Sequence, residues 1–326
     1  TLRDALDSHS HSRLLPGAAV PGLLLAELRA YKSLRSPTAA ERYGVICDLL
    51  GPAGTGDPEG SVDPEGTADP GRSLPRAVAL LELAQLLCSH SFAPHTDCSA
   101  LDAIQEALRL LESLAQHSQA QNSQIRDQLL DERAQALLWL HICTLEALME
   151  KSVARERRGR RRNAELPDGS EGSAGERPEP RDGIRCSLSS DSALSKPLDE
   201  AVSLWEQLLE NAGVPALRSP EQSAGSLQLL AALFLIQGKP LQALRSLRLL
   251  RSLCRRLGDG TGEAEALSQL CRILLQLECP GHAQVFLEEL ESCLEEEEEE
   301  GSDDSRLLLR HSRLLLRSQL CCLQNQ

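Results

Sequence analysis

Aromatic and β-branched residues are scarce in this chain. Phenylalanine, tryptophan and tyrosine make up 2% of the 326 residues, and valine and isoleucine together supply only 15. Because strands prefer these side chains, the composition excludes a large β-sheet and with it a doubly wound α/β enzyme. Methionine occurs once, at Met149, and the chain opens with Thr1. We therefore expect the sequence to be a fragment of a longer polypeptide.

Motifs of catalysis and cofactor binding are also missing. The sequence has no GxSxG, no glycine-rich phosphate loop, no HExxH, no EF-hand loop and no CxxC pair. Its 11 cysteines are odd in number and stand mostly among leucines, which predicts reduced, buried thiols and a location in the cytoplasm and nucleus. We predict no catalytic, cofactor-binding or metal-binding residues, and we disfavour an enzyme in its own right.

Positive charge is in deficit, with 34 basic against 48 acidic residues and a net charge of −14. A surface of this sign repels nucleic acid and anionic membranes, because both are bound through Lys and Arg. The longest uncharged apolar runs are also shorter than the roughly 20 residues that a membrane-spanning helix needs. We therefore expect neither nucleic acid nor a membrane among the partners.

Helix-forming residues dominate what remains, with 65 leucines alongside many Ala, Glu, Gln and Arg. The sequence therefore predicts an all-α fold. Ser219-Pro220, followed by Gln222, is typical of a capped helix start with a capping box, and Ser99 with Asp102 forms a similar start. The helix that begins at Pro220 is predicted to end at Gly238.

Two stretches of low complexity interrupt the helical pattern. Residues 51–73 are rich in Gly, Pro, Asp and Thr, and residues 155–184 combine arginines with Gly, Ser, Glu and Pro. Neither can bury enough apolar area to offset the entropy of ordering, so both are predicted to be disordered. They define an N-terminal helical block at 1–154, a linker at 155–184 and a C-terminal helical-repeat block at 185–326.

The C-terminal block contains an internal repeat of 40 to 43 residues. Lys196-Pro197-Leu198 recurs as Lys239-Pro240-Leu241, and Cys279-Pro280 follows. An alanine comes after each, and then apolar residues at helical spacing: Ala201, Trp205 and Leu208; Ala243, Leu247 and Leu250; Ala283, Leu287 and Leu290. The small residue lets two helices approach closely, and such a period predicts an α-solenoid of stacked tetratricopeptide-like hairpins.

Four side chains have a spacing that could hold zinc: Cys88, His90, His95 and Cys98. The favoured interpretation is a helix end and a polar turn whose cysteines face the core. His141 and Cys143 lie on a helix that is apolar nearly all round, from Leu129 to Leu148, and that we expect to be sandwiched between neighbours. Two residues apart on a helix they face different sides, so they cannot form a nucleophile–base pair.

Two charge runs have competing interpretations. Six arginines between Arg155 and Arg162 could serve nuclear import or phosphate binding, or simply extend a solvated helix end into the linker. The six glutamates from Glu295 to Glu300 are interpreted as a solvated helix end and acidic loop, with partner binding as the alternative.

Long segments of the chain resemble vertebrate separase. They are residues 23–50 (LLLAELRAYKSLRSPTAAERYGVICDLL), 81–114 and 126–158, and the similarity resumes with KPLDEAVSLWEQLL and continues to Leu323. The resemblance implies a large cysteine endopeptidase that cleaves the kleisin subunit of cohesin and releases sister chromatids at anaphase. It also implies that the protease domain follows a long helical superhelix and that the inhibitor securin binds along both.

The resemblance assigns this chain to the superhelix. The family's catalytic histidine precedes a glycine, and none of the eight histidines here does, so no catalytic residue is carried over. The family's Glu-x-x-Arg self-cleavage spacing occurs at Glu106–Arg109 inside a predicted helix, so self-cleavage here is not expected. We predict a non-catalytic scaffold segment that positions substrate and binds a securin-like chain; the alternative is a free-standing helical-repeat adaptor.

Overall fold

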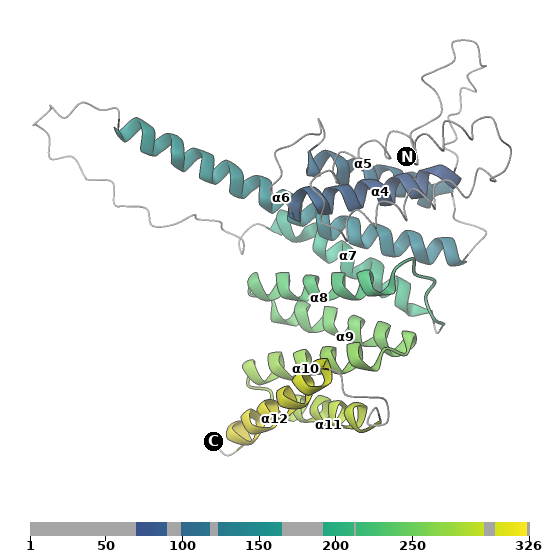
Figure 1. The fold of residues 1–326 in the computed structure, drawn as a ribbon, viewed down its shortest axis with the longest axis vertical. Helices are drawn as coiled ribbons and strands as arrows, with labels where there is room; N and C mark the ends of the chain where they lie inside the picture. The colour runs from purple at the N-terminus through teal and green to yellow at the C-terminus, as the bar shows by residue number, and fades with distance from the viewer. Residues whose placement is uncertain are drawn as a thin grey trace, which may run out of the picture. The chain divides into compact units, whose positions relative to one another are not determined.

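Most of the residues that the structure, a computed structural model, describes lie in α-helices; the described residues are 70–89, 99–117, 123–164, 192–211, 213–296 and 304–324 (Figure 1). The helices are α4 (Pro70–Ser89), α5 (Ala100–His117), α6 (Ser123–Ala164), α7 (Ser192–Glu210), α8 (Pro220–Ile236), α9 (Pro240–Leu257), α10 (Gly260–Gln276), α11 (Pro280–Glu296) and α12 (Asp304–Gln324). The predicted all-α fold is confirmed. None of these helices is long and apolar enough to cross a membrane.

The described residues form two compact units. One comprises the residues up to Leu114 together with Trp139–Leu194, and the other comprises Ala115–Leu138 together with Ser195 onward. Helix α6 contributes its first turns to the second unit and the remainder to the first. The C-terminal helices are thus joined by a helical segment that precedes the 155–184 stretch in the sequence.

At one end of each predicted disordered stretch the structure has a helix instead, so the prediction of disorder is wrong there. Helix α4 begins at Pro70, inside 51–73, and α6 continues to Ala164, inside 155–184. Proline is accepted at the first position of a helix, where its missing N–H is not needed. Arginine is a good helix former, so the arginine run extends α6 before Gly and Pro become frequent. The remaining parts, 51–69 and 165–184, lie outside the described residues.

In the first unit, α4 and α5 carry apolar faces that are fully buried. Ala77 and Leu81 of α4 and Ile104 and Leu111 of α5 belong to this core. The start of α5 is the predicted capping box. The N–H of Asp102 donates to Ser99 Oγ at 3.1 Å, and the N–H of Ser99 donates back to the Asp102 carboxylate at 3.3 Å.

In the second unit, α8 and α9 form one hairpin, α10 and α11 form the next, and α12 packs on both members of that second hairpin (Figure 1). The repeat predicted from the sequence places its alanines as expected, because Ala201, Ala243 and Ala283 are all buried on α7, α9 and α11. The apolar residues that follow them are buried as well. One detail differs: Pro240 and Pro280 begin their helices, whereas Pro197 lies inside α7.

The turns between these helices share a left-handed residue. Gly238 (φ 71°), Glu278 (φ 55°) and Gly258 (φ 73°) close α8, α10 and α9 in the same way. After Gly238, the main-chain N–H of Lys239 donates to the carbonyl of Phe234, five residues earlier, at 2.8 Å. After Glu278, the N–H of Cys279 donates to the carbonyl of Leu274 in the same way, at 2.9 Å. Glutamate in this conformation costs roughly 1 kcal/mol more than glycine, so the second copy of the turn is strained.

The start of α8 is only partly as predicted. Ser219 is the residue before the helix and Pro220 the first within it, as expected, but the Ser219 side chain makes no capping hydrogen bond. The capping box with Gln222 is therefore wrong. Proline at the first position already supplies a helical backbone angle, so this helix begins without side-chain support.

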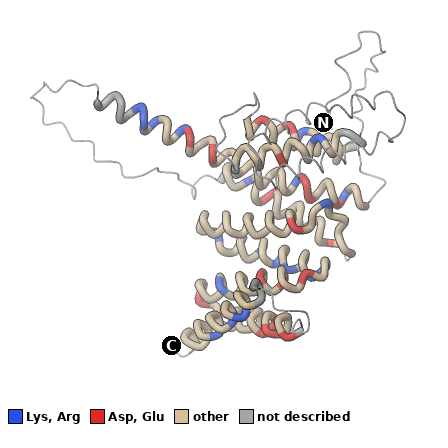
Figure 2. The backbone as a smooth tube through the Cα atoms, viewed as in Figure 1, with Lys and Arg blue, Asp and Glu red and all other residues tan. Residues whose placement is uncertain are grey.

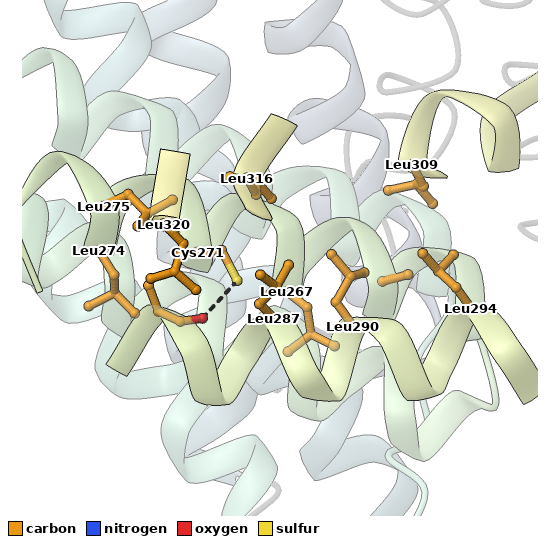
Figure 3. Packing of buried hydrophobic residues seen from close by; sticks show 12 residues of the cluster. Leu267, Cys271, Leu274, Leu275, Leu287, Leu290, Leu294, Leu309, Leu316 and Leu320 are labelled. Carbon is orange, nitrogen blue, oxygen red and sulfur yellow. Dashed lines mark hydrogen bonds between the residues drawn. The ribbon is translucent and has the colours of Figure 1, made fainter. Parts of the chain in front are cut away.

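Leucines fill the core between α10, α11 and α12. Figure 3 shows the cluster, in which Leu267 and Leu274 of α10 meet Leu287 and Leu290 of α11. Leu309, Leu316 and Leu320 of α12 close it. The Cys271 thiol lies in the same cluster, 3.6 Å from the main-chain oxygen of Ala283. The fully buried members of the cluster are neither aromatic nor charged, and Phe286 packs against them from its edge, so close packing of apolar side chains stabilises this core.

Helix α6 is sandwiched as predicted from Leu129 to Leu138, but it also buries charge. The Asp131 carboxylate is 1% exposed and accepts hydrogen bonds from Trp205 Nε1 at 2.9 Å and from Ser223 Oγ and Gln135 Nε2, each at 2.8 Å. Burial raises the pKa of Asp131, and the three donors oppose that rise. Leu148, at the end of the predicted stripe, is exposed.

Replacing Ala243 with glutamate tests the register of the repeat. Ala243 is fully buried on α9, so Ala243→Glu places an unpaired charge in the hairpin. We expect a loss of about 3 kcal/mol or more in the free energy of unfolding, measured by urea denaturation followed by circular dichroism. Ala232→Glu is the matched control, because Ala232 is exposed on α8. Equal stability of the two variants would contradict the register.

Removing the indole donor tests the Asp131 junction. Trp205→Phe leaves Asp131 Oδ1 buried without its partner, and we expect a cost of about 1–3 kcal/mol in the same unfolding measurement. Trp139→Phe makes the identical chemical change at a half-buried indole for which the described residues provide no acceptor. A similar cost for both variants would show that ring volume, rather than the hydrogen bond, carries the effect.

Candidate docking groove along α9

An open groove of about 860 Å³ runs over α9 in the second unit. Helix α9 forms its base, α10 and α11 form one side, and Glu206 of α7 stands at the other. The lining residues are Glu206, Leu241, Leu244, Arg245, Arg248, Leu249, Leu270, Leu274, His282 and Phe286. The groove exists because the second helices of successive hairpins lie next to one another, so it follows from the repeat.

The interior of the groove is mostly apolar. Leu244 and Phe286 are half-buried against the leucine core, and Leu274 reaches the surface from within it. Leu241 is 72% exposed although it lines the groove. A large apolar side chain at such exposure gains free energy when a partner covers it, about 25 cal/mol for each Å² removed from water.

Arginine is the only charged residue type on α9, and the helix has five: Arg245, Arg248, Arg251, Arg255 and Arg256 (Figure 2). Nε and Nη2 of Arg245 each donate a hydrogen bond to the Glu206 carboxylate, and this hydrogen bonding raises the pKa of Arg245. Its charge is therefore largely neutralised at the edge of the groove.

Three further arginines do not line the groove and are engaged by neighbouring helices. Arg251 bridges Glu263 and Glu289, and its guanidinium lies 5.8 Å from the ring centre of Phe286. Arg255 also binds Glu263, at 2.8 Å. Arg256 donates to main-chain oxygens at the end of α7, at 2.6 Å for that of Leu209, where the helix dipole favours a cation.

Arg248 is different. It is exposed on the lining of the groove, and among the described residues it has neither a hydrogen bond nor an ion pair. A guanidinium in this state offers five N–H donors to a ligand. Sequence reasoning found the helix but not this residue, since five similar arginines gave no sign of which four would be paired within the fold.

The residues considered for chemistry in the sequence are placed apart. His141 Nδ1 lies 2.6 Å from the main-chain oxygen of Leu194, whereas Cys143 Sγ lies 3.2 Å from Cys88 Sγ. The prediction of two core-facing side chains on different sides of α6 is confirmed. Cys88 is part of α4, and His90, His95 and Cys98 lie outside the described residues, so the zinc hypothesis stays a prediction.

The Cys88–Cys143 contact polarises the two thiols in opposite directions. The hydrogen bond between the two sulfurs lowers the pKa of Cys143, and the same bond, with burial and nearby Glu146, raises the pKa of Cys88. Neither sulfur lies beside an imidazole among the interactions of the described residues.

The charge runs are partly described. Arg155, Arg157 and Arg158 are exposed on the last turns of α6. Glu295 is exposed near the end of α11, and 297–300 lie outside the described residues. The Glu-x-x-Arg spacing lies within α5, where Arg109 Nε and Nη2 each donate to the Glu106 carboxylate at 2.8 Å. This segment is therefore helical rather than extended.

Most of the chain matches a known protein in sequence. No family model matches the chain. The sequence is 44% identical over 309 residues, 92% of the chain, to separin of the mouse, Mus musculus. The chain is separase-related. It spans 14% of the length of mouse separin, so it corresponds to one segment of a much longer relative.

The match confirms the resemblance to separase noted in the sequence. The groove along α9 is thus a feature of a separase-like segment. Identity of this level over nearly the whole chain also means that the helical architecture described here is shared with mouse separin over the matched residues.

Alkylation of the thiols tests the burial pattern. Burial raises the pKa of Cys254 and of Cys271 to about 12, so roughly one thiol in ten thousand is ionised at pH 8. Cys321 and Cys322 are exposed on α12. With iodoacetamide we expect α12 to be modified first and Cys254 and Cys271 at least a hundredfold more slowly, as measured by mass spectrometry of digests. Comparable rates would contradict the placement of α9 and α10.

Proposed function

We propose that this chain is a non-catalytic scaffold segment of a separase-like cysteine endopeptidase, a protein that cleaves the kleisin subunit of cohesin to release sister chromatids at anaphase. In this proposal the stacked hairpins position the substrate and bind an extended inhibitory chain of the securin type. The segment acts in the cytoplasm and nucleus and uses no cofactor. The groove along α9 is the site of contact.

One observation supports the groove as a binding surface: Leu241 remains 72% exposed beside a half-buried Phe286 and an unpaired Arg248. Extended segments dock in grooves whose pockets accept alternate side chains, and this groove combines apolar side chains with the unpaired guanidinium of Arg248. An extended chain suits it, because a stack of hairpins presents its binding surface along a line of successive helices.

Binding of the isolated segment should be weak. A chain that contacts both a scaffold and a protease domain gains from the high effective concentration of its second site, and the segment offers only the first. The relation to separin, in which the chain matches 14% of the length, supports this division of labour. A free-standing adaptor would instead bind its partners at full strength alone.

The experiment measures fluorescence anisotropy of a labelled securin-like chain and turnover of a fluorogenic kleisin peptide that carries a Glu-x-x-Arg site. We expect binding without turnover. Leu241→Ser removes apolar surface from the groove and should weaken binding about fivefold to tenfold. Ile236→Ser is the matched control, since Ile236 is 70% exposed on α8 and does not line the groove.

Turnover that thiol alkylation abolishes would refute the scaffold role. Binding that falls equally in both variants, or in neither, would remove the groove as the contact site while leaving the fold intact. Strong binding of other helical or unstructured proteins in place of the securin-like chain would favour the adaptor.

A further inference from the structure

The five arginines of α9 are not equivalent as ligands. Four are engaged within the fold, by Glu206, by Glu263 and Glu289, or by the carbonyl end of α7. Only Arg248 is exposed on the groove without a partner among the described residues. The groove therefore offers one uncompensated positive charge in a chain whose net charge is −14.

We infer that Arg248 is an anchor for a carboxylate, and that the groove selects a partner segment in which an acidic residue stands near an apolar one. This inference deepens the proposed function, on which it rests. A single free guanidinium matches a single Asp or Glu side chain, which it binds in bidentate fashion. A phosphate dianion is balanced better by two cations than by one, and the neighbouring Arg245 is already paired with Glu206, so the charge of the groove favours the singly charged carboxylate.

The spacing of the anchor follows from helix geometry. Leu244 and Arg248 are four residues apart on α9, which places them on one face and about 6 Å apart along the axis. Side chains on the same side of an extended chain repeat every second residue, about 6.6 Å. A ligand lying along α9 therefore matches the groove with the pattern apolar-x-acidic, its apolar side chain over Leu244 and Leu241 and its carboxylate on Arg248.

The opposing surface charge makes this anchor selective. Elsewhere the excess of acidic residues repels an acidic segment, so such a segment binds only where arginine is locally uncompensated. Paired arginines cannot substitute, because each would have to give up its carboxylate or carbonyl partner. The unpaired state of Arg248 is thus what distinguishes this part of α9 from the rest of the helix.

The test uses two labelled peptides in a Gly/Ser context, one with leucine and glutamate two residues apart and one with glutamine in place of the glutamate. Binding to the full chain is measured by anisotropy at low and at physiological salt. We expect the glutamate peptide to bind roughly tenfold more tightly than the glutamine peptide, and salt to reduce that difference. Arg248→Glu should abolish the preference.

Arg272→Glu is the matched control. Arg272 is exposed on α10, has no partner among the described residues and does not line this groove. Its reversal changes the net charge equally and should leave the preference intact. Equal loss in both variants would show a general field rather than an anchor, and equal binding of the two peptides to the unmodified chain would overturn the inference.

Failure of this inference is distinguishable from failure of the proposed function. If the securin-like chain binds and depends on Leu241 while neither peptide binds, the groove stands and the carboxylate anchor is refuted. If the glutamate peptide binds through Arg248 and the securin-like chain does not bind, the anchor stands and the proposed partner is wrong.

Discussion

The second unit depends on one buried carboxylate. Asp131 of α6 accepts hydrogen bonds from Trp205 of α7 and Ser223 of α8, so three helices from distant parts of the sequence meet at a single side chain. A short helix in a hairpin cannot bury its apolar face alone and would tolerate several positions against a leucine-rich neighbour. A buried acceptor without a donor lowers the stability of the fold. Asp131 therefore favours the one position of α7 and α8 in which Trp205 and Ser223 reach its carboxylate.

Around this junction the contacts are also polar and specific. Arg218 Nε donates to the buried Glu132 carboxylate at 2.5 Å, and the main-chain N–H of Ala216 donates to Asp127 at 3.2 Å. The segment before α8 is therefore held by carboxylates of α6. Beyond α8 the character of the packing changes: leucines fill the buried core between α10, α11 and α12, and ion pairs such as Arg251–Glu289 and Arg317–Glu291 lie at its edge. The polar contacts of α6 fix the position of α7 and α8. Burial of apolar side chains then stabilises the helices that follow.

The groove is a consequence of this order. When hairpins stack in register, their second helices lie in sequence along one side, and residues at corresponding positions line a shared surface. On α9 that surface is rich in arginine, and the acidic residues of neighbouring helices neutralise most of it. Among the arginines that line the groove, Arg248 is left without a partner beside the exposed Leu241, a combination that the net charge of the whole chain does not reveal.

The local features were available from the sequence because they depend on neighbours along the chain. Helical composition, the buried alanines Ala201, Ala243 and Ala283, the capping box of Ser99 and Asp102, and the opposite faces of His141 and Cys143 all follow from periodicity and short-range geometry. Tertiary contacts decided the rest. The sequence contains no sign that Asp131 would be buried, that Ser219 would not cap its helix, or which of the five arginines of α9 would have no partner among the described residues. Each of these outcomes depends on which residues, up to about ninety positions away, the folding of the chain brings within reach of a hydrogen bond.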